Sequence, residues 1–221
     1  MIQIDYSKDK LLTEFSHKTL QDRYLVGDEK SPQEGFARAA LAFADDEAHA
    51  QRLYDYASNL WFMFSTPVLS NGGTKRGLPI SCFLNHVEDS REGITEHYTE
   101  NAFLSSFGGG IGGSWSDVRA QGTQKSKGSE STGVIPFVKV VDAEMLAFSQ
   151  GITRRGSYAG YLHISHPEIE EFLDMRKPTG GDTNRKCLNL HHGIVINDKF
   201  MEIIHRATKE EGFDDSWELI D

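Results

Sequence analysis

Short apolar runs alternate with helix-like segments along most of this chain, and that alternation limits the folds it can adopt. Glycine, proline or serine bounds the runs, as at Pro79–Leu84 and Phe107–Trp115, which is typical of buried strands ending in tight turns. The pattern predicts strands around Thr66, Cys82, Ile111, Ile164 and Ile194. Helices are expected between or after them, over residues 90–104, 136–148, 167–177 and 198–208. Such alternation predicts parallel βαβ pairing and an α/β fold.

The first 64 residues instead have the pattern of a helical region. Ser31 and Pro32 are typical of a helix start, with serine as the N-cap and proline in the first turn. The acidic run Asp45–Glu47 interrupts the helical spacing and divides it into two helices. The apolar positions of this pattern are Phe36, Ala40, Phe43, Ala48, Leu53, Ala57 and Leu60. We expect this region to act as a scaffold.

Composition excludes several classes of protein. A net charge of −10 argues against a nucleic-acid groove, which needs clustered lysine and arginine. No apolar run is long enough to cross a bilayer, and the first residues lack the pattern of a signal peptide. The two cysteines, Cys82 and Cys187, lie far apart and do not form a disulfide framework. A cytoplasmic protein that binds neither membranes nor nucleic acid is therefore expected.

The glycine cluster contains a Gly-x-Gly-x-x-Gly pattern at Gly108, Gly110 and Gly113. A dinucleotide site would need a strand before this pattern and a helix after it. Here a helix-like segment precedes the glycines, and Ser114–Val118 has no helical character. A dinucleotide site is therefore rejected. No glycine loop is followed by Gly-Lys-Ser/Thr, so a Walker A site is absent from the sequence.

Cysteine and histidine patterns alone give no decisive site. An isolated cysteine such as Cys82 is most often a small buried apolar residue, and Cys187 is interpreted in the same way. The pairs His163/His166 and His191/His192 have metal-like spacing. Acidic or cysteine ligands that would complete such a site are not placed near them, so no metal is expected.

The Ser65–Gly73 run, the Pro79–Leu84 run and the glycine-rich Phe107–Trp115 run together resemble the large (alpha) subunit of class I ribonucleotide reductases. The resemblance implies an N-terminal helical region and then a ten-stranded α/β barrel built from two five-stranded halves. Residues 1–64 would be the helical region, without the ATP-cone domain that often precedes it. Residues 65–221 would be about the first half of the barrel, incomplete at its C-terminal end. The chain would then be half of a split subunit or a truncated piece.

The resemblance also assigns roles to individual residues. Cys82 matches one member of the redox-active dithiol that reduces the 2′ carbon of the ribose. A second set matches the substrate site: Ser65, Thr66, Ser81, Gly109 and Gly110. A third set matches the site for an effector, which is ATP or a deoxynucleoside triphosphate: Asp89, Ser90, Arg119 and Arg155, with Arg154 as the alternative to Arg155.

By this resemblance the chain contributes to a ribonucleoside-diphosphate reductase and is inactive alone. It would bind no cofactor directly, and the radical would come from a metal-containing small subunit. The implied partners are a second chain with the remainder of the large subunit, the small subunit, another large subunit in a homodimer, and thioredoxin or glutaredoxin as reductant. Two alternatives remain: a non-catalytic nucleotide-binding regulator derived from the enzyme, and a class II cobalamin-dependent relative.

Overall fold

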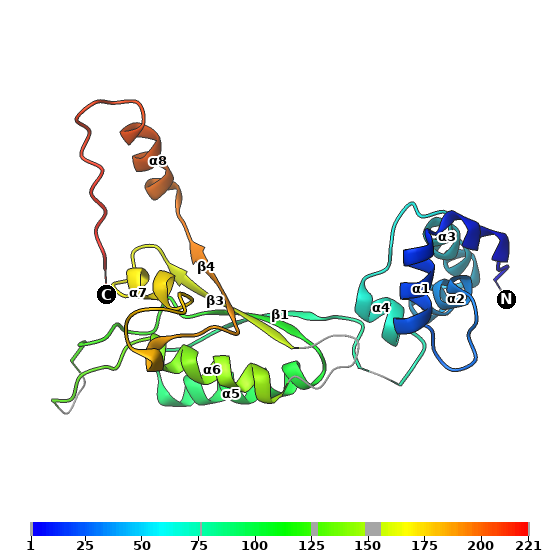
Figure 1. The fold of residues 1–221 in the computed structure, drawn as a ribbon, viewed down its shortest axis with the longest axis horizontal. Helices are drawn as coiled ribbons and strands as arrows, with labels where there is room; N and C mark the ends of the chain where they lie inside the picture. Colours follow the sequence, from blue (N-terminus) through cyan, green and yellow to red (C-terminus); the bar gives the residue numbers. More distant parts are fainter. Residues whose placement is uncertain (1, 76, 125–127, 149–155, 221) are drawn as a thin grey trace. The chain divides into compact units, whose positions relative to one another are not determined.

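The computed structural model describes residues 2–75, 77–124, 128–148 and 156–220. The chain divides into two compact units, Met1–Ser81 and Cys82–Asp221 (Figure 1). The sequence pattern placed the boundary earlier, between residues 64 and 65. Among the described residues, no helix is both long enough and apolar enough to cross a membrane.

The first unit is entirely helical within its described residues. Its elements are η1 (Tyr6–Leu11), α1 (Glu14–Arg23), α2 (Pro32–Phe43), α3 (Glu47–Ser58) and α4 (Thr66–Asn71). Ser31 begins α2 through a capping box with Glu34, and Asp46 caps α3, so the predicted helix start and the predicted interruption are confirmed. Residues from α2, α3 and α4 form the core, including Phe36, Tyr54 and Leu69.

The strand predicted around Thr66 is wrong, because Thr66–Asn71 forms α4. Pro67 lies in the first turn of this helix, where its missing N–H and fixed φ do no harm. Leu69 is buried in the helical core. A short apolar run cannot be assigned to a strand or a buried helix from periodicity alone, and here packing against α2 decides the outcome.

The second unit is a parallel sheet of four strands in the order β1-β2-β3-β4. The strands are β1 (Cys82–His86), β2 (Gly110–Ser114), β3 (Ser157–His163) and β4 (His191–Val195). The helices are α5 (Arg91–Ser106), α6 (Ile135–Ala147), α7 (Ile169–Asp174), η2 (Thr183–Arg185) and α8 (Asp198–Ala207). The predicted parallel βαβ arrangement is therefore confirmed, with the four strands from Cys82 onward as expected.

One face of the sheet packs against helices. Helices α5 and α6 run side by side along this face (Figure 1). Ile111, Tyr158 and Leu162 of the sheet are buried in the apolar core. Because side chains alternate along a strand, Cys82 and Gly110 lie on the opposite face. The sheet thus has a packed face and a face that carries the expected redox cysteine.

The segment Gly151–Gly160, expected to be a flexible basic loop, is a strand in its last residues, because β3 begins at Ser157. Tyr158 and Gly160 are buried against the helices, which favours strand over loop. Arg154 and Arg155 lie outside the residues that the structure describes.

Candidate functional site

The amino end of the sheet carries the expected redox and substrate residues. Cys82 is the first residue of β1 and is exposed, and its Cα partner in β2 is Gly110. The Gly109 N–H donates to the Leu104 carbonyl at 2.9 Å, and the Gly109 carbonyl accepts from Ser157 N at 3.3 Å. The structure therefore brings Cys82, Gly109 and Gly110 together, with the Gly109 backbone already engaged in hydrogen bonds.

Close packing explains why residue 109 is glycine. A Cβ there would lie 2.7 Å from the Leu104 carbonyl oxygen and 3.0 Å from the Phe83 ring. Such contacts would push β2 away from the end of α5. The glycine thus lets the backbone of this region lie close to β1.

The other expected substrate residues belong to the first unit. Ser65 is the N-cap residue of α4, and the Thr66 hydroxyl lies 3.2 Å from the Tyr24 hydroxyl. Ser81 is the last residue of that unit.

The carboxyl end of the sheet carries the expected effector residues. Asp89 follows β1 and Arg119 follows β2, and Arg119 Nε donates to Asp89 Oδ2 at 2.6 Å. Ser90 caps α5 by accepting a hydrogen bond from Gly93 N at 2.9 Å. An arginine and a helix N-terminus at one sheet end favour an anion there, because guanidinium and backbone N–H groups both donate to phosphate oxygens. The structure therefore brings Asp89, Ser90 and Arg119 together, and Arg155 lies outside the described residues.

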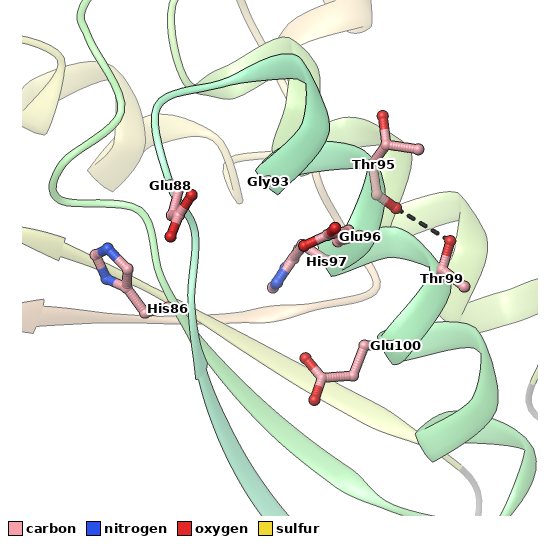
Figure 2. Close-up of a pocket in the computed structure, with 8 residues that line it drawn as sticks. All are labelled: His86, Glu88, Gly93, Thr95, Glu96, His97, Thr99 and Glu100. Atoms are coloured by element: carbon pink, nitrogen blue, oxygen red, sulfur yellow. Dashed lines mark hydrogen bonds between the residues drawn. The ribbon is translucent and has the colours of Figure 1, made fainter.

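A cavity of about 540 Å³ lies beside these residues, between the end of β1 and α5. Figure 2 shows His86 and Glu88 on one side of the cavity and Glu96, His97 and Glu100 of α5 on the other. The sequence analysis did not identify this cavity. The sequence does contain one indication of it, because Glu96 and Glu100 lie four residues apart and therefore on the same side of one helix. The acidic lining repels phosphate and suits groups that donate hydrogen bonds, such as hydroxyl or amino groups.

A buried polar cluster lies between α5 and the sheet. His97 Nε2 is 3.0 Å from the Tyr158 hydroxyl, which also accepts a hydrogen bond from Trp115 Nε1 at 2.8 Å. Burial lowers the pKa of His97 to about 4 and raises the pKa of Tyr158. The cluster is therefore neutral at physiological pH. It connects Trp115, the residue after β2, with Tyr158 of β3 and His97 of α5, between the two ends of the sheet.

The histidines with metal-like spacing have other partners. Both ring nitrogens of His166 bond to backbone groups, namely the Val118 carbonyl and the Glu168 N–H. His191 Nδ1 lies 2.9 Å from Arg176 Nη1. Cys187 is fully buried, and burial raises its pKa to about 12, so it stays a thiol. Within the described ranges, no group of three histidine, cysteine or acidic side chains could hold a metal ion.

Comparison with known proteins gives the family. The family model described as "Ribonucleotide reductase, all-alpha domain" matches residues 10–77, and that described as "Ribonucleotide reductase, barrel domain" matches residues 80–221. The chain belongs to the ribonucleotide reductase family. The helical unit corresponds to the all-alpha domain of this reductase family, and the four-stranded parallel sheet corresponds to the start of its α/β barrel.

Individual relatives agree with the family models. The chain is 44% identical over 220 residues to the ribonucleoside-diphosphate reductase large subunit of Invertebrate iridescent virus 6, covering 100% of this chain and 22% of the relative. It is 48% identical to that of Invertebrate iridescent virus 3, covering 92% and 31%. Among solved structures, the class Id ribonucleotide reductase alpha subunit of Actinobacillus ureae has a TM-score of 0.73 at 27% identity, covering 93% and 36%. The chain thus spans about a fifth to a third of these relatives.

Proposed function

We propose that this chain forms part of the large subunit of a ribonucleoside-diphosphate reductase. It would contribute one redox-active cysteine, part of the substrate site and the site for a nucleotide effector. The observation that carries the proposal is the pairing of Cys82 with Gly110 on one face and one end of the sheet, with Asp89 and Arg119 joined at the other end.

The reaction replaces the 2′ hydroxyl of a ribonucleoside diphosphate with hydrogen. That hydroxyl leaves as water, and two electrons must be supplied. In the proposed mechanism the thiol of Cys82 and a second thiol supply them and are oxidised to a disulfide. The exposed position of Cys82 at the start of β1 supports this role, because a reducing thiol must reach both the substrate and an external reductant.

The effector would bind at the carboxyl end of the sheet. The Arg119 guanidinium and the N-terminus of α5 would bind the phosphates, and Asp89 would accept a hydrogen bond from a ribose hydroxyl. The acidic cavity lined by Glu88, Glu96 and Glu100 is unsuitable for phosphate, so the phosphates would lie on the Arg119 side.

The activity needs groups beyond those described here. The chain spans 22% and 31% of the two viral relatives, so the remaining active-site residues would come from the rest of a large subunit, in the same or a second polypeptide. The other proposed partners are a second large subunit, the small subunit that generates the radical with its metal centre, and thioredoxin or glutaredoxin.

Thiol trapping after one turnover tests the proposal. The assembled, pre-reduced reductase is mixed with a ribonucleoside diphosphate without external reductant, quenched with an alkylating agent and digested. We expect the Cys82 peptide to be protected from alkylation in proportion to the deoxynucleotide formed, while buried Cys187 does not change with turnover. Full alkylation of Cys82 after product formation would contradict the proposed redox role.

A further inference from the structure

A buried carboxylate lies beyond the end of β3 and outside the residues assigned so far. Glu168 is only 7% exposed, yet it accepts three hydrogen bonds. Its Oε2 accepts from Val134 N at 2.8 Å and from Gln121 N at 3.2 Å, and its Oε1 accepts from Arg185 Nη2 at 3.2 Å. Burial raises the pKa of Glu168, while the Val134 amide, His166 and Arg185 oppose that rise. Because burying a carboxylate costs free energy unless hydrogen bonds compensate for it, the groups that Glu168 binds indicate its role.

The two amides that Glu168 binds belong to the two arms of one segment. The arms, residues 118–124 and 128–134, pair through Gly122 N with the Ser131 carbonyl at 3.0 Å and Ser131 N with the Thr123 carbonyl at 2.9 Å. Glu168 joins the arms near their base. Gly133 leaves room for it, because a Cβ there would overlap the carboxylate, whose carbon would be 2.6 Å away.

His166 fixes the start of the first arm. Its Nε2 lies 2.9 Å from the Val118 carbonyl, and because a carbonyl only accepts, Nε2 is the donor. Its Nδ1 accepts from Glu168 N at 3.1 Å. Arg119 therefore lies between two fixed backbone groups, the Val118 carbonyl held by His166 and the Gln121 N–H held by Glu168. The turn after β3 thus determines the backbone from which the Arg119 side chain extends.

We propose that Glu168 is a positioning residue for the anion site at Arg119. It fixes the backbone on the C-terminal side of Arg119 and joins both arms of the segment that carries this arginine. The inference rests on the proposed function, because it takes Arg119 as a ligand of the effector phosphates. It differs from a purely structural role, in which Glu168 would stabilise the fold and leave nucleotide affinity unchanged.

The chain offers a matched control in Glu171. Arg185 binds both acidic residues, through two hydrogen bonds to Glu171 and one to Glu168. Glu171 accepts its hydrogen bonds from Arg185, whereas Glu168 also accepts one from each of two described arm residues, Gln121 and Val134. Truncation of either side chain to alanine weakens the contacts of Arg185, which also donates from Nη1 to the Thr132 carbonyl at 3.3 Å. Only truncation of Glu168 removes the acceptor of the Gln121 and Val134 amides.

The experiment measures ATP affinity of the full-length protein by calorimetry for Glu168→Ala, Glu171→Ala and Arg119→Lys. We expect Glu168→Ala to weaken ATP binding about tenfold and Glu171→Ala to change it less than about twofold. In a double-mutant cycle, the loss caused by Glu168→Ala should shrink in the Arg119→Lys background, because a released backbone can misplace only an arginine that binds. A residue that lowers ATP affinity without acting through Arg119 would give the same loss in both backgrounds.

The other outcomes distinguish failure of this inference from failure of the proposed effector site. Equal losses for Glu168→Ala and Glu171→Ala, or a loss that is unchanged in the Arg119→Lys background, would overturn the inference and leave the proposed site intact. If wild type does not bind ATP, or Arg119→Lys leaves affinity unchanged, the proposed effector site fails and the inference fails with it. Should Glu168→Ala not fold, Glu168→Asp keeps the charge but shortens the reach to both amides, and the same criteria apply.

Discussion

The two ends of the four-stranded sheet are built on different principles. At the carboxyl end, side chains hold one another: Arg119 pairs with Asp89, His86 Nε2 lies 3.3 Å from Asp117 Oδ2, and Glu168 pairs with Arg185. At the amino end, the candidate groups are the thiol of Cys82 and the glycine backbone opposite it. Recognition of a charged ligand needs donors fixed in advance, whereas a redox thiol needs access and room for substrate. In the proposed function, recognition of the effector would therefore lie at one end of the sheet and redox chemistry at the other.

The largest expected effect is at the amino end. Cys82→Ser should lower multiple-turnover reduction in the assembled reductase by about 10³-fold or more, because serine cannot form the disulfide. ATP binding should stay within about twofold, since Asp89 and Arg119 lie at the other end of the sheet. Steady-state reduction and calorimetry on one preparation measure both. Normal turnover would remove Cys82 from the mechanism and break the comparison.

The second-largest effect is expected at the carboxyl end, on ATP binding instead of reduction. Arg119→Ala should weaken ATP binding about 10–100-fold, the range for losing charged hydrogen bonds, while reduction without effector changes little. Arg176→Ala is the control, because Arg176 is also an arginine of this unit but pairs with His191. Equal losses for both variants would mean that net charge, rather than a site at Arg119, governs binding.

A substitution next to the buried cluster of His97, Trp115 and Tyr158, between the two ends of the sheet, should lower the stability of both ends equally. A Cβ at Gly113 would overlap the Tyr158 hydroxyl and lie 2.9 Å from His97 Cε1, so Gly113→Ala should destabilise the protein by about 2–3 kcal/mol. Gly160→Ala is the matched control, because the nearest atom would be 3.6 Å away. Urea unfolding measures both variants. If Gly113→Ala is as stable as the wild type, the side chains of Tyr158 and His97 can move to make room for the added methyl group.

The smallest effect is a dependence on pH. The pKa of His97 is about 4 in the folded protein and about 6.5 when unfolded, so the unfolded chain binds more protons between these values. The contribution of His97 to stability is therefore complete well above pH 6.5, is reduced by about 2 kcal/mol at pH 5, and falls further toward pH 4. His97→Gln should flatten this part of the profile in unfolding experiments from pH 4 to 8. An unchanged slope would assign the dependence to other groups.

The sequence predicted helices and strands correctly where neighbouring residues determine them, and wrongly where packing against a distant element does. The alternation of apolar runs and helices predicted the parallel sheet, and Ser31 and Asp45–Glu47 predicted the helix boundaries. The run at Thr66 was assigned to a strand because only packing against α2 makes it helical. The expected effector residues Asp89 and Arg119 came from the family resemblance, and the structure adds that their side chains form a hydrogen bond.

Residues with distant partners were beyond any local pattern. Glu168 lies 47 positions from Gln121 and 34 from Val134, so no periodicity connects them. His166 was considered only as a metal ligand, because a side chain bonded to backbone has no signature in the sequence. The acidic cavity likewise combines residues after β1 with residues of α5.

The sequential strand order has a consequence for how the protein is made. Each strand pairs with the strand synthesised just before it, so no strand must wait for a distant partner. At ribosomal rates, the residues from β1 to β4 emerge over roughly ten seconds, far longer than the time for small structural elements to form. We expect the sheet to grow from β1 during translation, with each helix covering the pair just completed. Ribosome-bound chains arrested after β3 should then already resist protease across β1 and β2.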